Sequence, residues 1–193
     1  MSYMVHKLTQ ATAILAVVMA VVVLQLSSSA YAGETIKFDV AEDPTRFVFD
    51  KNGPLVESGL PDYGNPFVTQ GYIYPYGTLV GDDPGVDVNG KPLYPDKVIG
   101  EWTCYGFIIG EGANTKTGPI IISEQVYSFG EEAGSKTLIS NGYELADLNK
   151  PFLRAITGGT GPYVGARGQV TETLLAESKY HSVTFRFEIV LSD

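Results

Sequence analysis

The sequence is poor in the residues that build metal centres, redox sites and covalent cross-links. It contains one cysteine, Cys104, and two histidines, His6 and His181. A single cysteine excludes a disulfide within the chain, and a closed zinc centre needs three or four ligands that converge. A Ser-His-Asp triad would have to use His181, but no G-x-S-x-G elbow accompanies it. We therefore expect no metal and no cofactor, and we interpret His181 as an exposed residue at the start of the last strand, with a triad histidine as the alternative.

Basic residues and methionine are scarce as well. The chain has 13 Lys and Arg against 22 Asp and Glu, which gives a formal net charge of −9. An acidic surface repels phosphate backbones and anionic lipid, so nucleic acid is excluded as a partner. The three methionines all lie within the first 19 residues. The core beyond them must therefore be built from stiff β-branched and aromatic side chains.

The N-terminal segment has the pattern of a secretory signal peptide. Residues 1–10 carry Lys7 and no acid, residues 11–24 are an unbroken run of apolar and small residues, and Ala30-Tyr31-Ala32 form a small-x-small site. This order is typical of a signal peptide over residues 1–32, which leaves a domain at 33–193 that is secreted or periplasmic and has no stable membrane anchor after cleavage. The alternative is a retained anchor, for which the apolar run is shorter than the ~20 residues that span a bilayer.

Beyond residue 32 the pattern is that of strands, with almost no helical periodicity. The expected strands cover residues 35–41, 46–50, 67–74, 98–110, 119–129, 136–145, 152–157, 166–176 and 181–192. In the last of these, apolar residues from Val183 to Leu191 alternate with Thr184, Arg186 and Glu188, so one face lies in a core and the other in solvent. Short connections without crossover helices predict an all-β fold, an eight-stranded antiparallel closed β-barrel, with a two-sheet jelly roll as its rival.

Two loop segments resemble ligand sites but have simpler explanations. The segment between Leu79 and Lys97 is rich in Asp, Pro and Gly, which indicates an exposed loop. It lacks the D-x-D-x-D-G spacing and closing Glu of a calcium loop, which remains the alternative. Gly158-Gly159-Thr160-Gly161 lacks G-x-G-x-x-G and a following helix, so a tight turn between two strands is favoured over a phosphate cradle.

The same glycine-rich stretch carries a resemblance to a known superfamily. Residues 153–174 read LRAITGGTGPYVGARGQVTETL, which resembles the signature of the allene oxide cyclase and dirigent barrel superfamily. Residues 155–161 are similar to the allene oxide cyclase version, whereas Ala166-Arg167-Gly168 is similar to the dirigent version. The resemblance implies an eight-stranded barrel, often trimeric, with an apolar cavity open at one end. A homotrimer or homodimer is accordingly the expected assembly.

The resemblance also suggests three candidate catalytic residues. Allene oxide cyclases have a cavity cysteine after the long loop, a tyrosine before the AITGG stretch and a carboxylate in the first strand, which match Cys104, Tyr143 and Asp39. Ala41 replaces the asparagine that accompanies this carboxylate. Each residue also has a structural interpretation: a small buried hydrophobe for Cys104, a capping hydroxyl for Tyr143, and a place on the outer face for Asp39, since a one-residue shift of register exchanges the two faces.

Three further residues are predicted to contact a substrate. Tyr127 and Phe129 lie in an upstream segment that continues the resemblance more weakly, and Arg167 lies in the dirigent-like part of the signature. We expect Arg167 to be structural or to face the pocket. An arginine drawn inward needs a carboxylate partner, because an unpaired buried charge is very unfavourable.

The sequence thus predicts an exported barrel that binds an apolar unsaturated or phenolic small molecule and steers a stereoselective cyclisation or coupling, as a cyclase-type isomerase. Such proteins act mainly by orienting a reactive substrate. A non-catalytic carrier and an interaction scaffold are the alternatives. Catalysis requires polar groups that converge inside a cavity, a carrier has an apolar cavity, and a scaffold has a filled one.

Overall fold

The computed structural model describes residues 33–178 and 182–192, which form β-strands, loops and three short 3-10 turns. The strands are β1 (Thr35–Glu42), β2 (Val48–Phe49), β3 (Pro66–Pro75), β4 (Gly100–Ile108), β5 (Pro119–Ser128), β6 (Thr137–Leu145), β7 (Phe152–Thr160), β8 (Gly168–Glu177) and β9 (Val183–Leu191). The turns are η1 (Pro95–Lys97), η2 (Gly112–Asn114) and η3 (Gly161–Tyr163). No helix within these ranges is long and apolar enough to cross a membrane. The predicted signal peptide (1–32) and the interpretation of His181 concern residues outside the described ranges.

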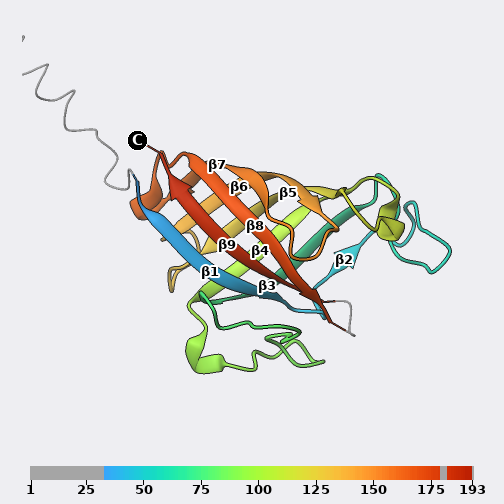
Figure 1. Ribbon diagram of the computed structural model, residues 1–193, viewed down its shortest axis with the longest axis horizontal. Coiled ribbons are helices and arrows are strands. Elements are labelled where there is room, and N and C mark those ends of the chain that lie inside the picture. The colour runs from blue at the N-terminus through green and yellow to red at the C-terminus, as the bar shows by residue number, and fades with distance from the viewer. Residues whose placement is uncertain (1–32, 179–181, 193) are drawn as a thin grey trace, which may run out of the picture.

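The strands form one antiparallel sheet that closes on itself. Their order is β1-β9-β8-β7-β6-β5-β4-β3, and β1 also pairs with β3, so that Phe38 lies opposite both Phe187 and Pro75. Figure 1 shows β1, in blue, between β9, in red, and β3. The short β2 pairs with the start of β3. The predicted eight-stranded antiparallel closed barrel is confirmed, and the jelly-roll alternative is wrong because one continuous ladder joins all the strands.

Alternation along each strand decides which side chains enter the barrel. In β9, Phe185, Phe187 and Ile189 are buried inside, whereas Arg186 and Glu188 lie on the outer face. This is the inward and outward pattern that the sequence predicted for the last strand. Closure leaves the barrel without the free edges that an open sheet exposes.

One half of the barrel is filled by aromatic side chains. The ring of Phe38 contacts the rings of Tyr127, Phe129 and Phe187, at centroid distances of 5.3, 5.4 and 5.1 Å. Edge-to-face and stacked pairs at these distances add to the stability that apolar burial provides. Ligand space must therefore be sought towards the other end, where β1 reaches Glu42.

The long loop between β3 and β4, drawn in green in Figure 1, lies against the outside of the wall. Leu79 and Val86 of this loop are buried together with Tyr74, so the prediction of an exposed segment between Leu79 and Lys97 is wrong at Val86. Acidic residues of the loop hold its turns. The carboxylate of Asp83 accepts hydrogen bonds from the backbone N–H of Gly85 and from the hydroxyl of Tyr94, and that of Asp87 accepts from the N–H groups of Asn89 and Lys91.

The glycine-rich stretch ends β7 and begins the connection to β8, as the prediction of a turn between two strands requires. Gly158 and Gly159 belong to β7, and Gly161 begins η3 with a φ of +58°. A Cβ at position 161 would collide with the backbone carbonyl of Ser135. The turn therefore requires glycine there for both its backbone angle and its close approach.

Candidate functional site

A cavity of about 540 Å³ opens at the end of the barrel where β1, β4, β6 and β8 finish. Its wall is mostly apolar and comes from both the strands and the loops that border the mouth. The apolar lining residues are Phe47, Leu60, Pro61, Phe67, Trp102, Ile108, Ala113, Ile120, Ile121, Leu145, Ala146, Leu148, Leu174, Val183 and Phe185. The polar ones are Glu42, Thr69, Cys104 and Glu144, together with Thr115, Lys116 and Glu177. This volume is within the range of small-molecule sites.

A layer of polar side chains crosses the barrel between the cavity and the aromatic half. Thr69, Cys104, Gln125 and Ser140 are successive cross-strand partners on β3, β4, β5 and β6. Glu42, Ser123, Glu144, Arg154 and Glu172 join them, all of them buried. We call these nine residues the polar layer. A buried set of this size holds only if its members satisfy one another.

Glu42 projects from the end of β1 into this layer. One carboxyl oxygen accepts a hydrogen bond from the Thr69 hydroxyl (2.7 Å), and the other accepts from the backbone N–H of Val183 (3.2 Å). Burial raises the pKa of Glu42 to about 7, and the negative charges of Glu144 and Asp43 act in the same direction. A carboxyl group whose pKa lies near neutrality can both give and accept a proton.

Glu144, on β6, is held by one of its two oxygens. Its Oε1 accepts hydrogen bonds from Gln125 Nε2 (2.9 Å), the Cys104 thiol (3.3 Å), Arg154 Nη1 (3.4 Å) and the Ser123 hydroxyl. Burial raises the pKa of the Cys104 thiol well above its ordinary value, and Glu144 adds to the shift. Cys104 therefore lines the cavity as a neutral thiol donor, which is a poor nucleophile.

Arg154, on β7, neutralises part of the negative charge in the layer. Its side chain is completely enclosed, and its Nε lies 3.4 Å from Oε2 of Glu172, which is equally enclosed. Burial raises the pKa of Glu172 well above its ordinary value, as does the charge of Glu144, while Arg154 acts in the opposite direction. Two carboxyl groups, those of Glu144 and Glu172, thus share one guanidinium, an arrangement that favours protonation of one of them.

The amide of Gln125 links the layer to two aromatic residues. Its Oε1 accepts hydrogen bonds from the hydroxyl of Tyr127 (2.7 Å) and from the indole N–H of Trp102 (3.3 Å). Trp102 lines the cavity, whereas Tyr127 lies below it among the aromatic rings. The indole of Trp102 is therefore held in a fixed orientation at the cavity wall.

Of the six predicted site residues, the structure places Cys104 in the cavity wall and Tyr127 and Phe129 in the aromatic half, away from it. Asp39 lies on the outer face of β1, so the prediction that it lines the cavity is wrong. It is buried under the long loop, where it accepts hydrogen bonds from Arg186 Nε (2.8 Å) and the N–H of Leu79 (3.0 Å). Its role in the structure is to fasten that loop to the barrel.

Tyr143 and Arg167 are also outside the cavity. Tyr143 is 54% exposed on the outer face of β6, because its neighbour Glu144 takes the inward position. Arg167 is exposed and donates to the backbone carbonyls of Thr157 (2.8 Å) and Ala166 (2.7 Å). No carboxylate among the described residues pairs with it, so the expectation that it faces the pocket is wrong.

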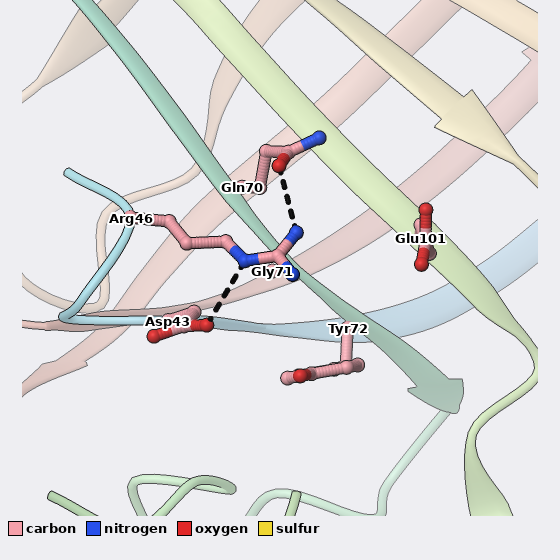
Figure 2. Close-up of a pocket in the computed structure, with 6 residues that line it drawn as sticks. All are labelled: Asp43, Arg46, Gln70, Gly71, Tyr72 and Glu101. Atoms are coloured by element: carbon pink, nitrogen blue, oxygen red, sulfur yellow. Dashed lines mark hydrogen bonds and ion pairs between the residues drawn. The ribbon is translucent and has the colours of Figure 1, made fainter. Parts of the chain in front are cut away.

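A second hollow, on the outside of the barrel, is too small for an organic ligand. Figure 2 shows Arg46 between Asp43 and Gln70 on the outer side of β3. The guanidinium lies 3.4 Å from Asp43 Oδ2 and donates to Gln70 Oε1 at 2.8 Å. The hollow has a volume of about 10 Å³, which holds no more than a water molecule.

Comparisons with known proteins establish the fold. Neither a protein-family model nor a curated protein matches the chain. The pterocarpan synthase dirigent protein PsPTS1 superposes with a TM-score of 0.55 at 17% identity, over 82% of this chain and 93% of that one. The pterocarpan synthase dirigent protein GePTS1 gives 0.51 at 16% identity, over 81% and 85%. The Diels Alderase AbmU from Streptomyces koyangensis gives 0.50 at 14% identity, over 88% and 73%. The chain therefore has a barrel fold similar to that of dirigent and cyclase-like proteins.

Proposed function

We propose that the barrel binds a small molecule with an apolar, unsaturated or phenolic body in this cavity and steers its stereoselective cyclisation, or the coupling of a molecule that is already reactive. The observation that carries the proposal is the mostly apolar cavity of about 540 Å³ with Glu42 and Glu144 together at its floor. An open cavity argues against a pure scaffold, and converging carboxyl groups argue against a simple carrier. Solved barrels of the same fold are named pterocarpan synthase dirigent proteins and a Diels Alderase, which agrees with this proposal.

The wall supplies orientation and the carboxyl groups supply proton transfer. Apolar side chains hold a flexible substrate in the conformation in which its reacting atoms meet, and good orientation alone is worth effective molarities of about 10⁵–10⁸ M. Glu42 gives a proton to one atom of the substrate, the ring bond forms, and another atom returns a proton to Glu42. Substrate and product then have the same composition, and no co-reactant is needed.

The Cys104 thiol and the Glu144 carboxylate have a supporting role in this scheme. Their negative and polar atoms stabilise positive charge that develops on the substrate near the floor of the cavity. Because the polar layer is fixed by its own hydrogen bonds, it does not have to reorganise as charge develops. This is the electrostatic arrangement that favours a transition state over a ground state.

Chiral analysis of reaction products tests the proposal. The purified protein is incubated with fatty-acid epoxides, polyenes and phenolic quinone methides that close rings spontaneously, and the enantiomeric excess of each product is measured. We expect an excess with at least one substrate, loss of the excess in Glu42→Gln, and retention in Glu101→Gln, which makes the same change on the outer face. Racemic products at the spontaneous rate, with saturable binding, would favour the carrier instead.

A further inference from the structure

The floor of the cavity carries acidic side chains without an accessible basic one, and this limits which end of a ligand can bind there. Glu42 and Glu144 both line the cavity and are each 4% exposed. Lys116 is the one basic residue among the described lining residues, and it lies exposed in the loop between β4 and β5. The floor is therefore acidic, with no cation of its own that opens into the cavity.

Arg154, the nearest buried cation, has no nitrogen left for a ligand. It does not line the cavity, and none of its side chain is exposed. Its nitrogens donate to the hydroxyl of Ser140 (3.2 Å), the carbonyl of Tyr143 (3.1 Å), and the carbonyl and hydroxyl of Ser123 (3.0 Å each). They also contact Glu144 and Glu172, each at 3.4 Å. A ligand carboxylate would consequently meet two carboxyl groups and no available guanidinium.

Glu144 in turn offers an acceptor. All the hydrogen bonds from described residues to this carboxyl go to Oε1, and none of those residues donates to Oε2. Because Glu144 lines the cavity, Oε2 is the atom that a ligand donor can reach. A carboxylate accepts most strongly from O–H and N⁺–H groups.

We infer that the ligand enters with a hydroxyl or ammonium group leading towards Glu144 and Glu42, and that the cavity rejects molecules whose leading group is a carboxylate. The inference rests on the proposed function, since it assigns a substrate class to the same cavity. The apolar body of the ligand then lies nearer the mouth, against Ile108 and Ile121, which are cross-strand partners at the ends of β4 and β5 where the cavity opens. A molecule with a free carboxylate binds only with that group outside, near Lys116.

Binding of four matched probes tests this inference. Trp102 is the single tryptophan of the chain and lines the cavity, so its fluorescence reports occupancy. Octan-1-ol, octylammonium, heptyl methyl ether and octanoate share an apolar chain and differ in the leading group. We expect octanoate to bind at least about tenfold more weakly than octan-1-ol, because like charges brought together in an interface are strongly unfavourable. We expect the ether, which cannot donate, to fall between them.

Two variants separate the acidic floor from general effects of mutation. In Glu144→Gln and in Glu42→Gln the gap between octan-1-ol and octanoate should narrow, whereas Glu101→Gln on the outer face should preserve it. Glu42→Gln carries the test alone if Glu144→Gln does not fold. Equal affinity of the native protein for octanoate and octan-1-ol would overturn the inference and leave the proposed cavity function standing. If none of the probes bound, by fluorescence or equilibrium dialysis, both would fail.

Discussion

Arg154 and Glu172, on the neighbouring strands β7 and β8, place Nε and Oε2 3.4 Å apart in the interior of the barrel, with neither side chain exposed. Removing the guanidinium leaves Glu172 and Glu144 buried without a cation. We predict that Arg154→Met lowers the free energy of unfolding by about 3–5 kcal/mol. Urea denaturation followed by circular dichroism measures it.

The surface arginine of the signature stretch provides the comparison for Arg154. Arg167 is exposed and contacts two backbone carbonyls, so Arg167→Met should change stability by less than about 1 kcal/mol. Adding Glu172→Gln to Arg154→Met should recover part of the loss, because it removes one of the two buried acidic groups that have lost their cationic partner. Similar urea midpoints for Arg154→Met and the native protein would contradict this account of the polar layer.

Stability should fall as pH rises through the range set by Glu42. Its pKa is raised from an ordinary 4.5 to about 7 in the folded protein, chiefly by burial. Below pH 4.5 both states hold the proton. Between pH 4.5 and 7 only the folded state holds it, so its stabilising contribution is lost over this interval, by about 3 kcal/mol. Thermal unfolding of native protein and Glu42→Gln at several pH values measures the difference. If the stability of the native protein fell with rising pH no more steeply than that of Glu42→Gln, a raised pKa of Glu42 would be excluded.

The glycine that begins η3 is predicted to be the sensitive one of the signature stretch. Gly161 has a φ of +58° and no room for a Cβ, whereas Gly165 has a φ of +79° with nothing near the Cβ position. Gly161→Ala should therefore lower the free energy of unfolding by more than about 2 kcal/mol, and Gly165→Ala only by the left-handed strain of about 1–2 kcal/mol. Equal losses of unfolding free energy in the two variants would show that the close contact with Ser135 does not contribute to the destabilisation.

Tyr143 and Ile121 provide opposite predictions for ligand binding. Tyr143→Phe should leave affinity and product enantiomeric excess unchanged, because this hydroxyl lies on the outer face. Ile121→Phe adds volume inside the cavity and should weaken octan-1-ol binding several-fold. Titration of Trp102 fluorescence compares the two. A loss in Tyr143→Phe as large as that in Ile121→Phe would refute the assignment of the two faces.

The alternation of apolar and polar residues was enough to predict the strands, since each strand carries its own period, but it left a two-sheet jelly roll open as the rival of the closed barrel. It was not enough to decide the inward face where both faces hold polar groups. A shift of the register by one residue exchanges the inward and outward faces of a strand. In β6 this decides whether Tyr143 or Glu144 points inward, and in β1 whether the face with Asp39 or the face with Glu42 does. For Glu172 a signal was available in the sequence. This residue lies between Val170 and Leu174 on one face of β8, and an apolar residue on each side indicates a face that points inward.

The polar layer itself was out of reach of a single sequence. Glu42, Glu144, Arg154 and Glu172 come from β1, β6, β7 and β8, and they meet only because the barrel closes with a particular stagger of its strands. No local motif marks that stagger. The burial of Asp39 was equally hidden, because it depends on the long loop folding back over the outer face of β1.

The central claim is that the cavity above Glu42 and Glu144 holds an apolar ligand, and the most direct measurement of it is anomalous diffraction from crystals soaked in 8-bromooctan-1-ol. We expect a bromine peak inside the cavity, on the mouth side of the polar layer and against the apolar wall that includes Ile108 and Ile121. A cavity filled by side chains, or bromine peaks confined to the outer surface of the barrel, would contradict it.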